Sequence, residues 1–266
     1  MDRSARRIWG LIYRHLALYR TSWPRLFEAI YWPLVSMLVW GFTARFFSAR
    51  LGSPSMVAAG VLLGGVILWE VCLRSQMGFS VSFLEEIWSR NLGHLFVSPL
   101  RPAELLLAFA ALAVLRMLIG VVPTALLAWL LYAFDILRVG PELVLFVLAL
   151  LLTGFAVALM VVAFIMRHGQ GAEALAWSIM FGMAPLSAIY YPVSVLPPSV
   201  RVVAELLPTT HVFEGMRTVL VHGVIAWDQL GQAFGIDLVW LAAGFALFVR
   251  EFHHARITGA LVTIGE

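Results

Sequence analysis

Long apolar runs recur along the whole sequence and constrain its fold more than any other feature. Six such runs occupy residues 26–47, 57–79, 104–133, 142–166, 172–191 and 231–250. Each approaches or exceeds the ~20 residues that a helix needs to cross the hydrocarbon core of a bilayer. Charged residues make up only 12% of the 266 residues, against about 25% in a typical soluble domain. The sequence therefore predicts an all-α integral membrane protein with six transmembrane helices, built as a single domain over residues 1–266.

The cationic residues are all arginines, because the chain has 18 of them and no lysine. This excludes a P-loop, whose lysine reaches the phosphates of a bound nucleotide, and it excludes Schiff-base chemistry. The chain also lacks the acid clusters, the Gly-x-Ser-x-Gly elbow and the His pair with a carboxylate base that a membrane-embedded enzyme acting on lipids would need. We expect no enzymatic activity, no cofactor bound by this chain and no nucleic-acid binding.

The arginines are distributed unevenly over the connecting segments. If the N-terminus lies in the cytoplasm, eleven arginines fall in inner segments and only five in outer segments, as the positive-inside rule requires. The distribution predicts a multi-pass protein of the inner (plasma) membrane with both termini cytoplasmic.

Residues 1–23 contain five arginines, so they do not form a signal peptide. Their apolar side chains share one helical stripe, formed by Ile8, Leu11, Ile12, Leu16 and Tyr19. Such a stripe predicts an amphipathic helix lying in the membrane interface. A simple positively charged anchor is the alternative, and the two interpretations are compatible.

Residues 192–230 differ from the apolar runs because they contain four prolines. The helical stretch at 209–221 has ~13 residues and is too short to cross a bilayer. We expect a re-entrant or interfacial hairpin on the outer side, before the last span.

A second amphipathic stretch joins the second and third spans on the predicted cytoplasmic side. We expect a coupling helix at 82–97 that presents charged and aromatic side chains to a soluble partner. An ordinary amphipathic connector is the alternative. The candidate contact residues are Glu85, Glu86, Trp88, Arg90 and His94.

Two segments carry a family resemblance. In residues 85–100 a pair of glutamates leads into LGHLFVSPL, which resembles the cytoplasmic signature of type-2 ABC export permeases. Residues 191–217 resemble the pattern Pro-x-x-x-Leu-Pro … Leu-Pro-x-(Thr/Ala)-His-x-x-(Glu/Asp)-x-x-Arg that precedes the last span of these permeases. The chain departs from the family at Arg90-Asn91, where Gly-Thr is usual, and at Ser187-Ala188, where Ser-Gly is usual.

The resemblance implies the membrane subunit of an ATP-driven exporter. Such a permease forms a dimer, for which two identical copies are the expected form. Each copy binds a cytosolic ABC ATPase that holds ATP-Mg, and the coupling helix conveys closure of the ATPase to the spans. Substrates of such permeases include lipid-linked glycans, polysaccharides, lipids and drugs, and the apolar spans favour an amphipathic or hydrophobic cargo.

Two further sets of polar residues are candidate sites. Glu70 and Arg74 are four residues apart on one helix, and counting from the cytoplasmic ends places Arg116 where it could meet Glu70. This set either fixes helix register or faces substrate. The second set, His211, Glu214 and Arg217, lies on one helical face near the outer surface. It is either an outer gate or a local network that holds the hairpin, and it has too few ligands to bind a metal.

The aromatic residues and the mode of transport leave alternatives open. The ten tryptophans and six tyrosines could line a sugar-stacking path, but many lie near predicted span ends, which favours interfacial belts. A membrane-embedded enzyme acting on lipids and a secondary transporter are the alternatives to an ATP-driven exporter. Measuring ATP-dependent transport with and without a partner ATPase would separate all three.

Overall fold

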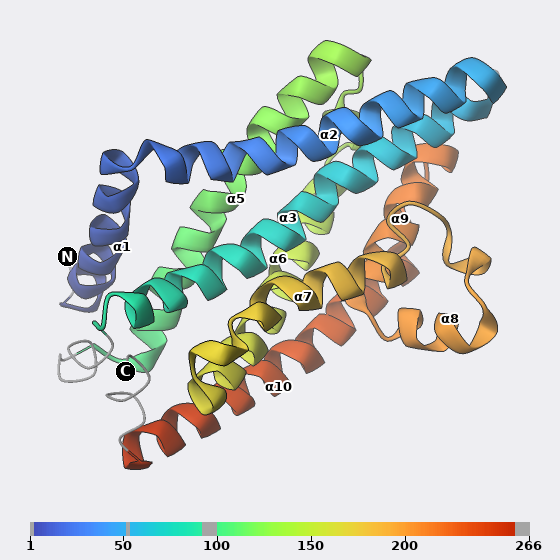
Figure 1. Ribbon diagram of the computed structural model, residues 1–266. Coiled ribbons are helices and arrows are strands. Elements are labelled where there is room, and N and C mark those ends of the chain that lie inside the picture. The colour runs from blue at the N-terminus through green and yellow to red at the C-terminus, as the bar shows by residue number, and fades with distance from the viewer. Residues whose placement is uncertain (1–2, 52–53, 92–99, 259–266) are drawn as a thin grey trace.

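The computed structural model describes residues 3–51, 54–91 and 100–258, and this part of the chain contains helices and turns but no strand (Figure 1). The long helices are α2 (Trp23–Leu51), α3 (Pro54–Trp88), α5 (Pro102–Tyr132), α6 (Glu142–His168) and α10 (Trp227–Thr258). The shorter ones are α1 (Arg3–Thr21), α7 (Ala174–Met183), α8 (Pro198–Glu205) and α9 (Pro208–His222), with 3₁₀ turns η1 (Ile136–Val139), η2 (Gln170–Ala172), η3 (Ala184–Leu186) and η4 (Val193–Val195).

The five long helices are the ones that are long and apolar enough to cross a membrane, among the residues described. Helix α3 forms the centre of the bundle, because 67% of its most apolar stretch is buried, against 17% for α2 and 22% for α10. It packs against α2, α5 and α6, and α10 packs along the other side of α6. The exposed faces of α2 and α10 are therefore available to lipid or to another protein.

Small residues let the helices approach closely. A side chain at Gly78 of α3 would place its Cβ 2.8 Å from the Cα of Ala113 on α5. A side chain at Gly154 of α6 would collide with the hydroxyl of Ser75 on α3. Without a hydrophobic drive between helices in lipid, such close backbone approach supplies much of the packing energy.

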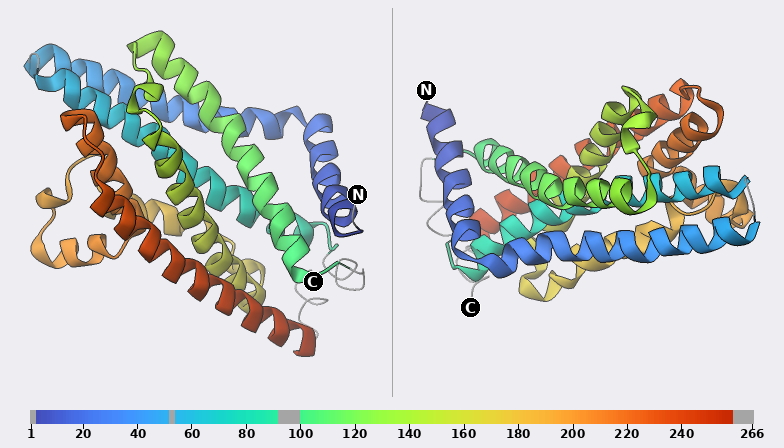
Figure 2. Two further views of the ribbon diagram at one scale, coloured as in Figure 1. Left: turned by 180° about the vertical axis from the view of Figure 1, so that it is seen from behind. Right: turned by 90° about the horizontal axis from the view of Figure 1, so that it is seen from above.

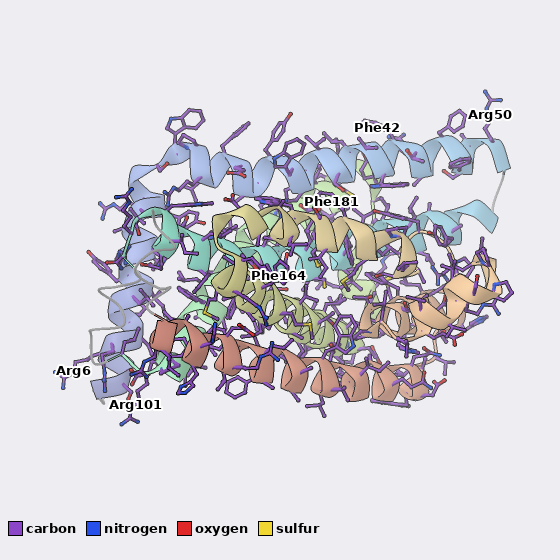
Figure 3. The ribbon with its side chains drawn as sticks, turned by 60° about the horizontal axis from the view of Figure 1, so that its bottom comes forward. Arg6, Phe42, Arg50, Arg101, Phe164 and Phe181 are labelled. Atoms are coloured by element: carbon purple, nitrogen blue, oxygen red, sulfur yellow. The ribbon has the colours of Figure 1, made fainter. Side chains whose placement is uncertain are left out.

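Helix α1 lies across one end of the bundle (Figure 2). It packs on α5, with Leu11 buried and Ile8 and Ile12 against the core. The predicted N-terminal helix and its inward apolar stripe are thus confirmed, while its position in the membrane interface stays a prediction. Arg6 and Arg101 lie at this end of the molecule and Arg50 at the opposite end (Figure 3).

The predicted coupling helix has different bounds in the structure. Helix α3 continues without interruption to Trp88, so residues 82–88 are its last two turns and not the start of a separate helix at 82–97. Residues 89–90 form a turn, and residues 92–97 lie outside the described residues. The charged pair Glu85-Glu86 made the span seem to end near residue 79, but α3 remains helical and largely buried beyond that point.

The predicted fifth span at 172–191 is not one helix. Helix α7 has 10 residues and a length of about 15 Å, which is roughly half of the ~30 Å hydrocarbon core. Pro185, which has no backbone N–H, lies in the 3₁₀ turn that follows, and Ala188 has a left-handed backbone with φ of 55°. These two residues end the helix, so the described residues contain five helices of spanning length instead of six.

The segment between α7 and α10 contains two helices. Helix α9 matches the helical stretch predicted at 209–221, and the shorter α8 precedes it. Helix α9 packs against α10, α3 and α6, so it is part of the bundle rather than a free loop. A re-entrant path for this segment stays a prediction.

Candidate substrate groove and its ion network

A groove of about 580 Å³ runs along the side of the bundle. Its walls come mainly from α2, α3 and α7, with Tyr19 of α1 and Arg116 of α5 at one end. It forms where α7 and the chain around Tyr190 flank α3 opposite α2. The groove therefore runs beside the central helix, along the exposed helix α2.

Aromatic side chains cover much of the groove wall. Trp40 and Tyr190 stack with their ring centroids 4.3 Å apart, and Trp69 adds a third ring from α3. Trp32 of α2 and Trp177 of α7 also line the groove, although both lie near ends of predicted spans, where interfacial belts are expected. The wall thus offers flat apolar faces together with indole N–H and phenol O–H groups.

Glu70 and Arg74 lie on the groove wall and bind each other, as their spacing predicts. The Arg74 Nε to Glu70 Oε2 distance is 3.0 Å, and the two side chains are only 17% and 5% exposed. The predicted meeting of Glu70 with Arg116 is wrong, because Arg116 binds a different glutamate. The depth of Glu70 was counted from residue 79, whereas α3 ends nine residues later.

Glu85 is the partner of Arg116. Its carboxylate accepts hydrogen bonds from Arg116 Nη2 at 2.9 Å and from Arg25 Nη1 at 3.1 Å, and His15 Nδ1 lies 3.0 Å away. Arg116 also lies over the ring of Tyr19, 5.0 Å from its centroid, in a cation–π contact. The Arg116 side chain runs from its own position toward the N-terminal end of α5, as helical side chains do, and so reaches Glu85.

Glu86 lies beside Glu85 in the same buried cluster. It accepts hydrogen bonds from Arg14 Nη1 at 2.8 Å and from Asn91 Nδ2 at 2.7 Å. His15 Nε2 lies 2.8 Å from its other oxygen, so the fully buried His15 bridges both glutamates. We call this cluster the inner network; its residues are Arg14, His15, Arg25, Glu85, Glu86, Asn91 and Arg116.

The charge of His15 is set by its two carboxylate partners. Burial by itself lowers the pKa of His15, but the hydrogen bonds to Glu85 and Glu86 and their negative charge outweigh it and raise the pKa above its ordinary value. Both ring nitrogens can donate only when the imidazole is protonated. The inner network therefore favours a charged His15.

The exposure expected for the coupling residues is wrong at the two glutamates. The Glu86 side chain is fully buried and that of Glu85 only 11% exposed, because α1 covers this end of α3. Trp88 is 48% exposed and Arg90 is exposed, whereas His94 lies outside the described residues. Sequence reasoning missed Arg14, His15 and Arg25, whose partners are 60 or more residues away along the chain.

Arg90, which stands where glycine is usual in the resembling permeases, has an unusual backbone conformation. Arg90 has a left-handed backbone with φ of 53°, a conformation that glycine adopts without steric cost. The glycine that is usual at this place in the resembling permeases suits this turn. Arg90 therefore adopts this turn under mild strain.

The second predicted set, which we call the outer cluster, consists of His211, Glu214 and Arg217. His211 bonds to the side chain of Gln229 and to the carbonyl of Glu205, both at 2.9 Å.

Arg217 binds Glu214 at 2.9 Å and donates to the Ala188 carbonyl at 2.9 Å. Glu214 accepts from the backbone N–H of Val193 at 2.6 Å. These bonds hold α9 to its neighbouring segments, as the network interpretation requires. His211 and Glu214 border a separate hollow of about 550 Å³, and none of the three lines the groove.

Five helices of spanning length within the described ranges, a lateral groove and buried ion pairs define a multi-pass helical membrane protein with room for a ligand along its side. The sequence profile of the ABC-2 type transporter family matches residues 7–221, from α1 to the end of α9. The chain belongs to this family. It is thus a permease, the transport subunit of an ABC transporter, and is not itself catalytic. Comparison with curated proteins found no match.

Proposed function

We propose that this permease is the membrane subunit of an ATP-driven exporter and that the groove on α2, α3 and α7 carries its substrate. The observation that supports this most directly is the groove itself, which combines aromatic faces with ion pairs along one side of the bundle. An amphipathic substrate matches such a wall, because its apolar part packs on rings while its polar part meets N–H and O–H groups. Lipid-linked glycans, polysaccharides, lipids and drugs are the candidate substrates.

We place α1 at the cytoplasmic side, with both termini inside and the inner (plasma) membrane as the location. Residues 172–191 then cross as a broken fifth span, which brings the number of crossings to six, and residues 192–222 return on the outer side. Hydrogen bonds support a joint between these segments: Ser187 and Thr209 lie 2.7 Å apart, and Thr210 donates to the Leu186 carbonyl at 3.2 Å. They tie the end of α7 to the start of α9.

The partner is a cytosolic ABC ATPase that holds ATP-Mg and docks at the α1 end. The exposed Trp88 and Arg90, with the neighbouring coupling segment, are the proposed contacts. The inner network then carries movement inward, because Arg25, Glu85 and Arg116 belong both to it and to the groove wall. Force on α1 or on the end of α3 would thus reach the groove through ion pairs rather than through loops.

A second identical copy completes the proposed path. Helix α2 carries large aromatic side chains that are exposed in one copy, among them Phe27, Tyr31 and Phe42. Two copies that face each other through this side would close the groove against lipid. Membrane lipid covers the remaining apolar surface.

The test uses the permease and its ATPase reconstituted in vesicles, with ATP-driven export as the readout. Ser36 lies on the groove wall, so Ser36→Trp should block export by filling the groove. The matched control is Ala242→Trp, on an exposed face of α10, which should leave export unchanged. Unimpaired export by Ser36→Trp would refute the groove as the path. Export driven by an ion gradient without the ATPase would instead favour a secondary transporter, and chemical conversion of the lipid would favour a membrane enzyme.

A further inference from the structure

The charged side chains on the groove wall carry no net formal charge. Among the residues that line the groove, six are charged: Arg25, Glu28, Glu70, Arg74, Glu85 and Arg116. Three are cationic and three are anionic, so their formal charges sum to zero. A second identical copy facing the first would double both signs and leave the sum unchanged.

The arginines of the wall are already paired with carboxylates of the same wall. Arg74 lies 3.0 Å from Glu70, Arg116 lies 2.9 Å from Glu85, and Arg25 lies 3.1 Å from Glu85. An anionic group that enters the groove therefore competes with Glu70 or Glu85 for a guanidinium group. A charge that stays unpaired in a low-dielectric site is costly, and removing one partner of a buried pair is costly too.

The aromatic residues on the rest of the wall favour a ligand with uncharged rings. Trp32, Trp40, Trp69, Trp177 and Tyr190 all line the groove. Flat apolar faces pack well against such rings, and the indole and phenol groups bind uncharged polar atoms. The described wall has no excess of cationic over anionic side chains.

We infer that the groove selects substrates whose ring-bearing part carries no net charge and is attached to an apolar body. This rests on the proposed function, in which the groove is the export path. Two sources share this chemistry: the uncharged sugar of a glycolipid and an uncharged planar drug. An anionic headgroup belongs to the class that the wall rejects.

The experiment uses a matched pair of lipids in vesicles that contain the permease and its ATPase. Monoglucosyl diacylglycerol and glucuronosyl diacylglycerol have the same chains and ring and differ in one carboxylate, and an uncharged polycyclic dye represents the second source. ATP-driven movement of each probe to the outer leaflet is measured. We expect the glucosyl lipid, the dye, or both to move at least about tenfold faster than the glucuronosyl lipid, since the carboxylate must compete with Glu70 or Glu85 for a guanidinium group.

Two variants shift the balance by one charge in the same direction. Glu28→Gln replaces an exposed wall residue, and Glu70→Gln leaves Arg74 without its partner. Each gives the wall a net positive charge and should raise movement of the glucuronosyl lipid relative to the uncharged probes. Glu28 lies within 4 Å of no cationic group in the described part of the chain, so Glu28→Gln tests the inference even where Glu70→Gln lowers folded yield.

The inference is overturned if wild type moves the glucuronosyl lipid as fast as both uncharged probes, or if it moves neither uncharged probe. The Ser36→Trp variant separates this outcome from failure of the proposed function. If Ser36→Trp blocks every probe that wild type moves, the groove is the export path and the result concerns only its charge preference. If it blocks none, the groove is not the path.

Discussion

The inner network and the outer cluster are both built from charged and polar side chains, yet they connect very different parts of the chain. The inner network joins α1, α2, α3 and α5, and His15 and Glu86 in it are 71 residues apart. The outer cluster joins α9 to segments within about 30 residues of it. Three residues of the inner network also line the groove, whereas no member of the outer cluster does. The first arrangement can transmit movement between helices, and the second holds one segment in place.

The largest effect is expected from breaking the inner network at Glu86. Glu86→Ala leaves the buried His15 and the half-buried Arg14 without one carboxylate, and the loss of one partner from a buried ion pair destabilises by about 3 kcal/mol or more. We expect a lower midpoint of thermal unfolding and faster amide hydrogen exchange in α1. Glu28→Gln, at an exposed glutamate outside this network, serves as the control and should change neither. Unchanged exchange in α1 for Glu86→Ala would show that the network does not hold this helix.

The next effect is a pH dependence of the inner network. The raised pKa of His15 means that its contribution to stability is fully present below the ordinary histidine pKa of about 6.5 and is lost as pH rises through the higher folded-state value. Hydrogen exchange in α1, corrected for its intrinsic rate, should therefore become faster as the pH rises above about 6.5. His15→Gln should remove this dependence. A dependence that persists in His15→Gln would assign it to another group.

The smallest effect is expected at the turn after α3. Arg90→Gly removes the strain of a left-handed backbone, which costs of order 1 kcal/mol for a residue with a side chain. The midpoint of thermal unfolding should therefore rise slightly or stay the same. Arg90→Ala keeps the strain and removes the same charge. If Arg90 contacts the ATPase, both variants should weaken ATPase binding equally, as measured by co-purification. Equal binding by wild type and both variants would exclude Arg90 from the contact.

The long spans could be predicted from the sequence, because an apolar run is a property of neighbouring residues. The ends of α3 and α7 were not predicted correctly. Glu85 and Glu86 resemble the polar end of a span, and only the folding of α1 over them shows that they are buried. Pro185 was a visible signal that α7 ends early, but an apolar count passes over a single proline.

The candidate sites divide in the same way. The bond between Glu70 and Arg74 follows from a spacing of four residues, so it was predictable. The bond between Arg116 and Glu85 depends on how α3 and α5 are staggered, which no local pattern gives. The tryptophans of the groove can be found in the sequence. Their position on one wall depends on the path of residues 172–191, where α7 ends early.

The coupling role of the inner network is tested most directly by measuring ATP hydrolysis and export in the same vesicles for Arg116→Gln. This variant removes one of three partners of Glu85 and leaves Arg25 and His15 in place, so the bundle should fold. Arg217→Gln is the matched control from the outer cluster, where the lost bonds are local. We predict that Arg116→Gln keeps most of the hydrolysis but exports several-fold less substrate per ATP, whereas Arg217→Gln keeps the wild-type ratio. An unchanged ratio of export to hydrolysis in Arg116→Gln would contradict the account.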